Sequence, residues 1–340
     1  MVDRQRIVAT DTEPPGDLAK EVEAASSGRY SVRGIADLSP SERSRVEVLV
    51  LLRSAAVTRE LFRDMPNVGM LQSMSAGVDF IDFTAVPAGV TVCSNAGAYR
   101  ESIAEHVFAM ILYFAKNLRR NHERLREGVF NSSIDGTFLG GKTIGIIGAG
   151  GIGGSVARVA RSFKMRTIGI NTNGRPVEGF DATWKLTKLV DLLRAADVVV
   201  VSIPLTIHTR RLIDGRRLSL MKDDCILVNV GRGETIEQAA LYSRLRATPT
   251  FRAGIDVWWS YPKRGERFSP DFPFFDLPNF LASPHIADGV PEAIRHGQEH
   301  AFRNVMRYVR GEPPERVVER SEYLGLKPTH STRGSAFRRV

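Results

Sequence analysis

A glycine-rich turn in the middle of the chain constrains the fold more than any other feature of the sequence. The segment GKTIGIIGAGGIGGSVARVARSF places Gly148, Gly150 and Gly153 in G-x-G-x-x-G spacing, after an apolar strand-like run and before a helical pattern. Glycines so placed permit a tight turn, bring backbone N–H groups close to a pyrophosphate and let helix and strand pack closely. The segment predicts a dinucleotide site that includes Gly151 and Ile152; the alternative is a glycine-rich turn without a ligand.

Two series of short apolar runs alternate with helical stretches, which predicts parallel sheets covered by helices. The first series ends near Val92 and contains RIVAT, VEVLVLL, VGMLQSMS and GVTVCSN. The second contains KTIGIIG, RTIGIN, ADVVVVSIP, CILVNVG and FRAGIDV, whose apolar character suits a sheet buried on both faces. We therefore expect an α/β fold with two doubly wound parallel-sheet domains.

Apolar residues at spacings of three and four predict two longer helices. One extends from about Ser102 to Arg126, and the other from Pro291 to about Val309. The second helix has no strand series of its own, so we expect it to pack back on the first domain.

Composition and charge exclude several classes of protein. The chain has 340 residues, no apolar run long enough for a membrane span and no signal-peptide pattern, so we expect a cytoplasmic protein without a membrane partner. The formal charge is +9, but the basic residues are interspersed with acids except in the tail from Lys327 to Val340, so nucleic acid is not an expected partner. Cys93 and Cys225 each adjoin an apolar run and are expected in the core, with no metal site.

The end of the second strand of the glycine-rich domain bears on the choice of cofactor. An acidic residue commonly binds the adenosine ribose of NAD at this place, but here Asn171 stands in TIGINTNGRP, followed by Thr172, Asn173 and Arg175. An asparagine does not repel a 2′-phosphate, and Arg175 offers a bidentate contact to one. We favour NADP over NAD; the alternative is an exposed polar turn that tolerates either.

Two polar residues follow later strands of the same series. ILVNVGRGETI places Arg232 after a buried strand, where an arginine is costly unless it meets an anion, and NFLASPHIADG presents His285 on a loop. A lone histidine is usually structural, as we expect of His106 and His208. Together with a hydride-carrying cofactor, Arg232 and His285 form a candidate reaction site.

Several motifs in register resemble the D-isomer-specific 2-hydroxyacid dehydrogenase family, whose members include glyoxylate/hydroxypyruvate reductases and phosphoglycerate dehydrogenases. They are SMSAGVDFID, NAGAYRESIAEHVFAMIL, GKTIGIIGAGGIGG, PLTIHTRRLIDGRRLSLMKDDCILVNVGRG, GIDVWW and LPNFLASPHIA. The resemblance implies a Rossmann cofactor domain, residues 118–284, inserted into a flavodoxin-like substrate domain made of residues 1–117 and 285–325. Residues 326–340 would form a flexible basic tail.

The resemblance also implies roles for individual residues in the transfer of a hydride between NAD(P) and a small 2-oxo or D-2-hydroxy acid. Arg232 would bind the substrate carboxylate, and His285 would act as general acid and base. The substrate's other carboxylate oxygen would meet the backbone of Ser75, Ala76, Gly77 and Val78. The cofactor would meet Ile203, Pro204, Thr209, Val230, Gly231 and, near the nicotinamide, Asp256.

The sequence departs from the family pattern at Tyr261. Family members commonly have a glutamate five residues after the equivalent of Asp256, and it holds the proton on the catalytic histidine. A tyrosine can orient an imidazole but is neutral at pH 7, so we expect oxo-acid reduction to weaken above neutral pH.

Two other functions remain open at this point. Formate dehydrogenases resemble this sequence in having a neutral residue at the position of that glutamate, and dinucleotide-sensing corepressors resemble the same family. On resemblance alone the chain would be a homodimer, with LRRNHERLREGVF in the contact. The substrate's side chain is not readable from the sequence.

Overall fold

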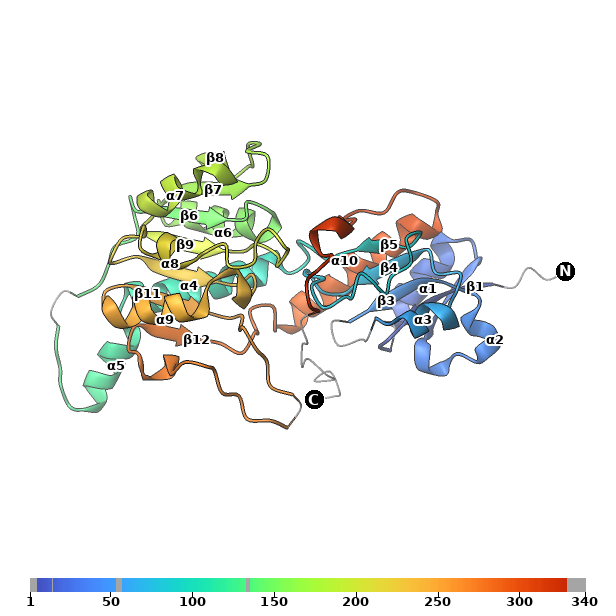
Figure 1. Ribbon diagram of the computed structural model, residues 1–340, viewed down its shortest axis with the longest axis horizontal. Coiled ribbons are helices and arrows are strands. Elements are labelled where there is room, and N and C mark those ends of the chain that lie inside the picture. Colours follow the sequence, from blue (N-terminus) through green and yellow to red (C-terminus); the bar gives the residue numbers. More distant parts are fainter. Residues whose placement is uncertain (1–4, 14, 53–56, 133–134, 264, 329–340) are drawn as a thin grey trace. The chain divides into compact units, whose positions relative to one another are not determined.

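A computed structural model describes residues 5–13, 15–52, 57–132, 135–263 and 265–328 (Figure 1). Its contacts divide the chain into two units: residues 1–99, 261–267 and 291–340 form the first, and residues 100–260 and 268–290 the second. Every pairing between two strands of the described residues is parallel, with one sheet in each unit, and one isolated antiparallel bridge joins Cys93 to Val317. The predicted fold class of two parallel-sheet α/β domains is confirmed.

The first sheet has five strands in the order β2-β1-β3-β4-β5, the flavodoxin-like arrangement. Its strands are β1 (Arg6–Thr10), β2 (Tyr30–Gly34), β3 (Val46–Leu51), β4 (Met70–Ser73) and β5 (Thr91–Cys93). The helices of this unit are α1 (Gly16–Ala25), α2 (Pro40–Arg43), α3 (Arg59–Asp64) and α10 (Pro291–Val309).

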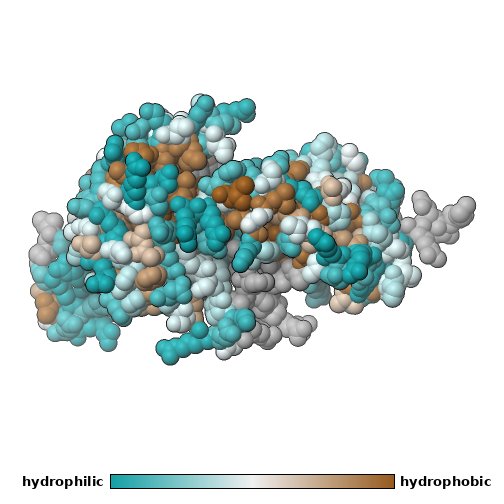
Figure 2. All heavy atoms as spheres, in the orientation of Figure 1, coloured by the Kyte–Doolittle hydropathy of each residue, from teal (hydrophilic) through white to brown (hydrophobic). Residues whose placement is uncertain are grey.

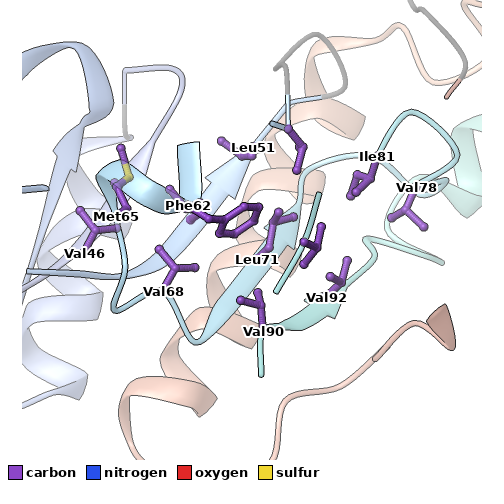
Figure 3. Close-up of a cluster of buried hydrophobic side chains, with 14 of the residues drawn as sticks. Val46, Leu51, Phe62, Met65, Val68, Leu71, Val78, Ile81, Val90 and Val92 are labelled. Atoms are coloured by element: carbon purple, nitrogen blue, oxygen red, sulfur yellow. The ribbon is translucent and has the colours of Figure 1, made fainter. Parts of the chain in front are cut away.

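Two apolar clusters cover the faces of this sheet. On one face, Leu18 and Val22 of α1 and Phe302 and Val305 of α10 pack over the strands. On the other face, Phe62 of α3 and the loops before and after β4 close the core (Figure 3). The prediction that the last long helix packs on the first domain is therefore confirmed.

The second sheet has seven strands in the order β12-β11-β10-β9-β6-β7-β8, which is the Rossmann arrangement with one added strand. Its strands are β6 (Thr143–Ile147), β7 (Arg166–Asn171), β8 (Ala182–Lys185), β9 (Val198–Val201), β10 (Ile226–Asn229), β11 (Arg252–Ile255) and β12 (Phe280–Ala282). The helices of this unit are α4 (Arg100–Ala115), α5 (Leu118–Arg126), α6 (Gly151–Ser162), α7 (Leu189–Ala195), α8 (Gly215–Leu218) and α9 (Gln238–Ala247).

The long helix predicted from Ser102 to Arg126 is wrong in its extent. It is two helices, α4 and α5, because Asn117 adopts a left-handed conformation with φ of 46°. Leu118, the first residue of α5, is 54% exposed. The sequence also missed β8 and β12, whose runs ATWK and FLA are only four and three residues long.

The structure groups α4 with the second sheet because this helix packs against it; a Cβ on Gly254 of β11 would meet the side chain of Met110. The domain boundaries at residues 117 and 284 remain predictions. Cys93 and Cys225 are both buried and unpaired, which confirms their assignment to the core. Among the described residues, no helix has the length and apolar character that crossing a membrane requires.

Candidate functional site

The carboxyl ends of four parallel strands place the predicted residues at one edge of the second sheet. The glycine turn follows β6, Ile203 follows β9, Arg232 follows β10 and His285 follows β12. Strands β6 and β9 are neighbours, but the chain leaves them toward opposite edges of the sheet. Such a switch point is where open α/β sheets bind ligands.

The three glycines of the turn have three different surroundings. Gly148 has φ of 109°, and a Cβ on it would lie 2.9 Å from the carbonyl oxygen of Ser202. A Cβ on Gly153 would lie 2.1 Å from the carbonyl oxygen of Gly148, whereas one on Gly150 would meet nothing within 4 Å. The space over Gly150 is therefore open in front of the first turn of α6.

That first turn is suited to an anion. Helix α6 starts at Gly151, and its N-cap residue, Gly150, offers no side chain to its N–H groups. The N–H groups of Gly151, Ile152 and Gly153 thus face the open space with the positive end of the helix dipole behind them. These residues fit the pyrophosphate of a dinucleotide.

The loop after β7 is shaped by Asn171 itself. Its Oδ1 accepts a hydrogen bond from the N–H of Gly174, and its Nδ2 donates to the carbonyl of Arg175 at 2.9 Å. Both ends of this amide are thus used within the turn, while Thr172, Asn173 and Arg175 are exposed. The Arg175 guanidinium forms no ion pair with a described residue. Lys185, which no sequence pattern indicated, pairs with Asn171 across the strands and lies against Gly174.

The loops after β9 and β10 pack directly on one another. Thr209 Oγ1 donates to the carbonyl of Pro204 at 2.7 Å and accepts the N–H of Thr206 at 2.8 Å, which closes the loop after β9. Val230 is buried, and a Cβ on Gly231 would lie 2.6 Å from the carbonyl oxygen of Ile203. A further residue missed from the sequence is Ser202, whose hydroxyl donates to the carbonyl of Gly148 at 3.1 Å.

Arg232 sits on a tightly held loop. Its carbonyl accepts hydrogen bonds from the Asn229 side chain at 3.0 Å and from the Thr235 hydroxyl at 2.6 Å. Gly233 is required next to it, since a Cβ there would lie 2.3 Å from the backbone carbon of Trp258. The Arg232 side chain is half-buried and donates to the carbonyl of Gly231 at 2.8 Å.

The buried carboxylate of Asp256 holds the His285 loop. Asp256 is 1% exposed, and its Oδ1 accepts the Ser283 hydroxyl at 2.6 Å and the N–H of Ile286 at 2.9 Å. Its Oδ2 accepts the N–H of Ala287 at 3.2 Å. These donors lie on both sides of His285, whose φ is 59°. The carboxylate therefore fixes a backbone conformation that few non-glycine residues adopt.

His106 completes this network from α4. Its Nε2 lies 2.9 Å from Ser283 Oγ and 3.7 Å from Asp256 Oδ1. Because the serine hydroxyl donates to Asp256, it accepts from Nε2–H, so His106 carries its proton on Nε2 if it is neutral. The structural role of His106 remains a prediction, and its hydrogen-bond network leads to the His285 loop.

Both tryptophans of DVWW donate hydrogen bonds to loops at the carboxyl edge of the second sheet. Trp258 is 6% exposed among Phe268, Phe275 and Phe280, and its Nε1 donates to the carbonyl of Ser283 at 3.0 Å. Trp259 stacks on Phe274, and its Nε1 donates to the carbonyl of Ile236 at 2.6 Å. The Trp258 ring is enclosed by these phenylalanines.

The remaining predicted residues belong to the first unit. Ser75, Ala76, Gly77 and Val78 follow β4, and the Ser75 carbonyl accepts the N–H of Asn95 at 3.0 Å. Tyr261 also belongs to the first unit. Its pairing with His285 therefore remains a prediction.

Comparisons with known proteins agree with this geometry. Residues 108–287 match the family model described as D-isomer specific 2-hydroxyacid dehydrogenase, NAD binding domain. The chain is 30% identical over 292 residues to a glyoxylate reductase from Pyrococcus furiosus, covering 83% of this chain and 85% of the relative.

Two solved structures extend the likeness. D-lactate dehydrogenase from Aquifex aeolicus, complexed with NAD and lactic acid, is 26% identical with a TM-score of 0.71, over 90% of this chain and 96% of that one. An acyclic imino acid reductase in complex with NADPH and D-Arg is 25% identical with a TM-score of 0.74, over 93% of this chain and all of that one.

Proposed function

The chain belongs to the D-isomer-specific 2-hydroxyacid dehydrogenase family, and from this premise we propose that it reduces glyoxylate or a similarly small 2-oxo acid to the 2-hydroxy acid. It is an NAD(P)-dependent oxidoreductase of 2-hydroxy acids. The observation that supports the proposal most is the common edge of the second sheet, to which β6, β10 and β12 bring the glycine turn, Arg232 and His285.

The chain's own residues have separable tasks in this reaction. The bound nicotinamide cofactor supplies or accepts the hydride. Arg232 binds the carboxylate of the oxo acid by charge-assisted hydrogen bonds, and its loop leaves it little freedom to move. His285 donates a proton to the carbonyl oxygen during reduction and removes it from the hydroxyl during oxidation. Asp256 does not meet the substrate in this scheme; it holds the loop that carries His285.

We propose NADP as the preferred cofactor. Thr172, Asn173 and Arg175 are exposed beside the turn, and no acidic side chain ends β7 to repel a 2′-phosphate. Replacing Arg175 by alanine should raise KM for NADPH about tenfold and leave KM for NADH nearly unchanged. Equal effects on both cofactors would show that Arg175 does not contact the 2′-phosphate.

The substrate is tested with a panel of glyoxylate, hydroxypyruvate, pyruvate, phenylpyruvate and formate, each with both cofactors. We expect the highest kcat/KM for glyoxylate or hydroxypyruvate. R232A should lose at least about a hundredfold in kcat/KM, and H285Q should lose turnover while still binding NADPH. Turnover of formate alone would instead indicate a formate dehydrogenase. R232A that keeps a cellular role without turnover would indicate a binding module.

We also propose that the protein is a homodimer. The segment around α5 exposes apolar side chains that a monomer would leave in water: Leu118, Leu125, Val129, Phe130 and Phe138 are between 48% and 86% exposed. This segment includes LRRNHERLREGVF, the predicted contact. A cluster of exposed apolar residues of this size is typical of an interface between subunits.

A further inference from the structure

A cavity of about 280 Å³ in the first unit is lined by arginines that the proposed reaction does not use. It lies between the second half of α10 and the segment that follows this helix. Four arginines, two glutamates and His300 are among its lining residues. Its volume is just below the ~300–1,000 Å³ of most small-molecule sites, so a ligand has to be small.

The wall of this cavity is rigidly attached. Asn304 of α10 is 6% exposed; its Nδ2 donates to the carbonyl of Glu315 at 2.9 Å, and its Oδ1 accepts the N–H of Glu315 at 2.6 Å. The next carbonyl, that of Arg316, accepts the N–H of Ser94 at 3.0 Å. These hydrogen bonds hold the segment against α10 and the residue that follows β5.

The cavity is lined by more arginines than glutamates. Arg307 forms ion pairs with both lining glutamates, Glu312 at 3.5 Å and Glu315 at 3.7 Å. Arg303, Arg310 and Arg316 form no ion pair with any residue that the structure describes. Three arginines without an ion pair to a described residue thus line one small cavity, an arrangement that favours an anion.

His300 stands at the base of this cluster. Asn95 donates through Nδ2 to the carbonyls of Met74 and Gly297, so its Oδ1 is the atom that lies 2.7 Å from His300 Nδ1 and accepts from it. Burial lowers the pKa of His300, and Arg303, Arg316 and His296 lower it further, while Glu315 raises it. Since an anion favours the protonated imidazole, its binding should raise this pKa and should be tighter at lower pH.

We propose that this cavity is a binding site for a small multivalent anion that carries phosphate or carboxylate groups. Arg303, Arg310 and Arg316 supply the positive charge, and His300 adds a second donor through Nε2 when it is protonated. The occupant neutralises cations that otherwise repel one another across the cavity.

The site also has a short path to the predicted substrate loop. Asn95 is fully buried and bonds both to His300 and to the carbonyl of Ser75, the first residue of the Ser75–Val78 loop. An anion that shifts the His300 imidazole therefore acts on a residue that holds this loop. The expected effect of the anion on substrate affinity rests on the proposed function. The binding of the anion to the cavity does not.

Binding is tested on the full chain with inorganic phosphate and citrate as probes. The imidazole signal of His300, assigned by its loss in H300Q, is followed by NMR across pH with and without each probe. In the native protein we expect at least one probe to raise the titration midpoint by about half a pH unit or more. Since the cofactor and substrate sites also attract anions, only this local signal decides the matter.

The variant R303Q/R316Q removes two of the cations and should weaken that probe about tenfold or more. Its matched control is R59Q/R194Q, which loses the same charge from exposed arginines of α3 and α7 and should respond as the native protein does. No shift with either probe in the native protein, or an equal response in R303Q/R316Q, would overturn the proposed site.

A kinetic measurement then tests the path through Asn95. With cofactor saturating, the probe that binds should change KM for glyoxylate at least twofold in the native protein and in R59Q/R194Q, but not in R303Q/R316Q. Binding without a change in KM would refute the path and leave the site standing. A protein that turns over no oxo acid would refute the proposed function, while the NMR result still decides the site.

Discussion

Asp256 is the residue on which the geometry of the reaction site depends most. Its carboxylate is enclosed and accepts hydrogen bonds from donors before and after His285. An amide of the same shape has one oxygen fewer, and its NH2 group would face a backbone N–H. We therefore expect D256N to unfold with a free energy lower by about 1–3 kcal/mol and to lose at least about tenfold in kcat. Urea unfolding and turnover of glyoxylate measure the two effects.

The matched control for this change is D197N. Asp197 also accepts a backbone N–H, that of Thr143 at 2.7 Å, but it precedes β9, at the amino end of the sheet. It should lose stability and keep its turnover. A D256N protein with native kcat would show that the His285 loop holds its conformation without the carboxylate.

Tyr261 gives the second prediction at this scale. A carboxylate beside His285 favours the imidazolium and so raises the pKa of the histidine, whereas a neutral phenol does not. If Tyr261 occupies that place, Y261E should extend oxo-acid reduction to higher pH, by about one unit or more in the upper limb of the kcat/KM profile. Y261F controls for loss of the hydroxyl. A profile unchanged in Y261E would assign the task to another acid.

Residue roles were predictable from sequence only where the backbone alone determines them. The positions of Gly148, Gly150 and Gly153 can be recognised from the sequence because the steric requirement for glycine acts within one turn. The hold of Asp256 on the His285 loop joins residues about thirty positions apart through a buried carboxylate, and no local pattern indicates it. The packing of Trp258 among phenylalanines was hidden for the same reason.

At the scale of single elements, two glycines of the turn between β6 and α6 are expected to have different tasks, one in stability and the other in cofactor binding. A Cβ on Gly153 would overlap the carbonyl oxygen of Gly148, whereas a Cβ on Gly150 would enter open space. G153A should therefore lower the free energy of unfolding by about 1–3 kcal/mol. G150A should unfold as the native protein does but bind NADPH at least about tenfold more weakly, because its methyl group occupies the approach of the pyrophosphate.

Urea unfolding and a fluorescence titration with NADPH distinguish the two variants, and each serves as the control for the other. Native cofactor affinity in G150A would mean that the phosphates lie elsewhere. Native stability in G153A would mean that α6 can move away from the turn without cost.

Elements were predictable where apolar periodicity is continuous and less so where one residue interrupts it. Strands β6, β7, β9 and β10 are indicated by runs rich in β-branched residues, and β11 by the apolar run FRAGIDV. The break between α4 and α5 does not, because the apolar spacing continues past Ala115 and only the left-handed Asn117 ends the helix.

At the scale of the whole molecule, the sequence predicted two α/β domains because both strand series leave room for crossover helices. The strand orders followed from the family resemblance, since apolar pattern alone cannot order parallel strands within a sheet.

The cavity around His300 was not predictable. Its arginines are surface residues, and only the fold brings the segment with Arg316 beside those at the end of α10. Figure 2 shows hydrophilic residues over much of the visible surface, so an exposed polar side chain by itself singles out no site.

The state of association gives the last prediction. Phe130 and Phe138 are 86% and 75% exposed, and burying such rings between two subunits would contribute about 1.5–3 kcal/mol each. F130D/F138D places charges where the apolar contact is expected and should convert a dimer into a monomer at micromolar concentration, as measured by light scattering after gel filtration. V190D is the control, since Val190 is 37% exposed on α7, outside the predicted contact, and should leave the dimer intact. If the variant remained a dimer, the subunits would have to meet through another surface; if the native chain were a monomer, these rings would need a different partner.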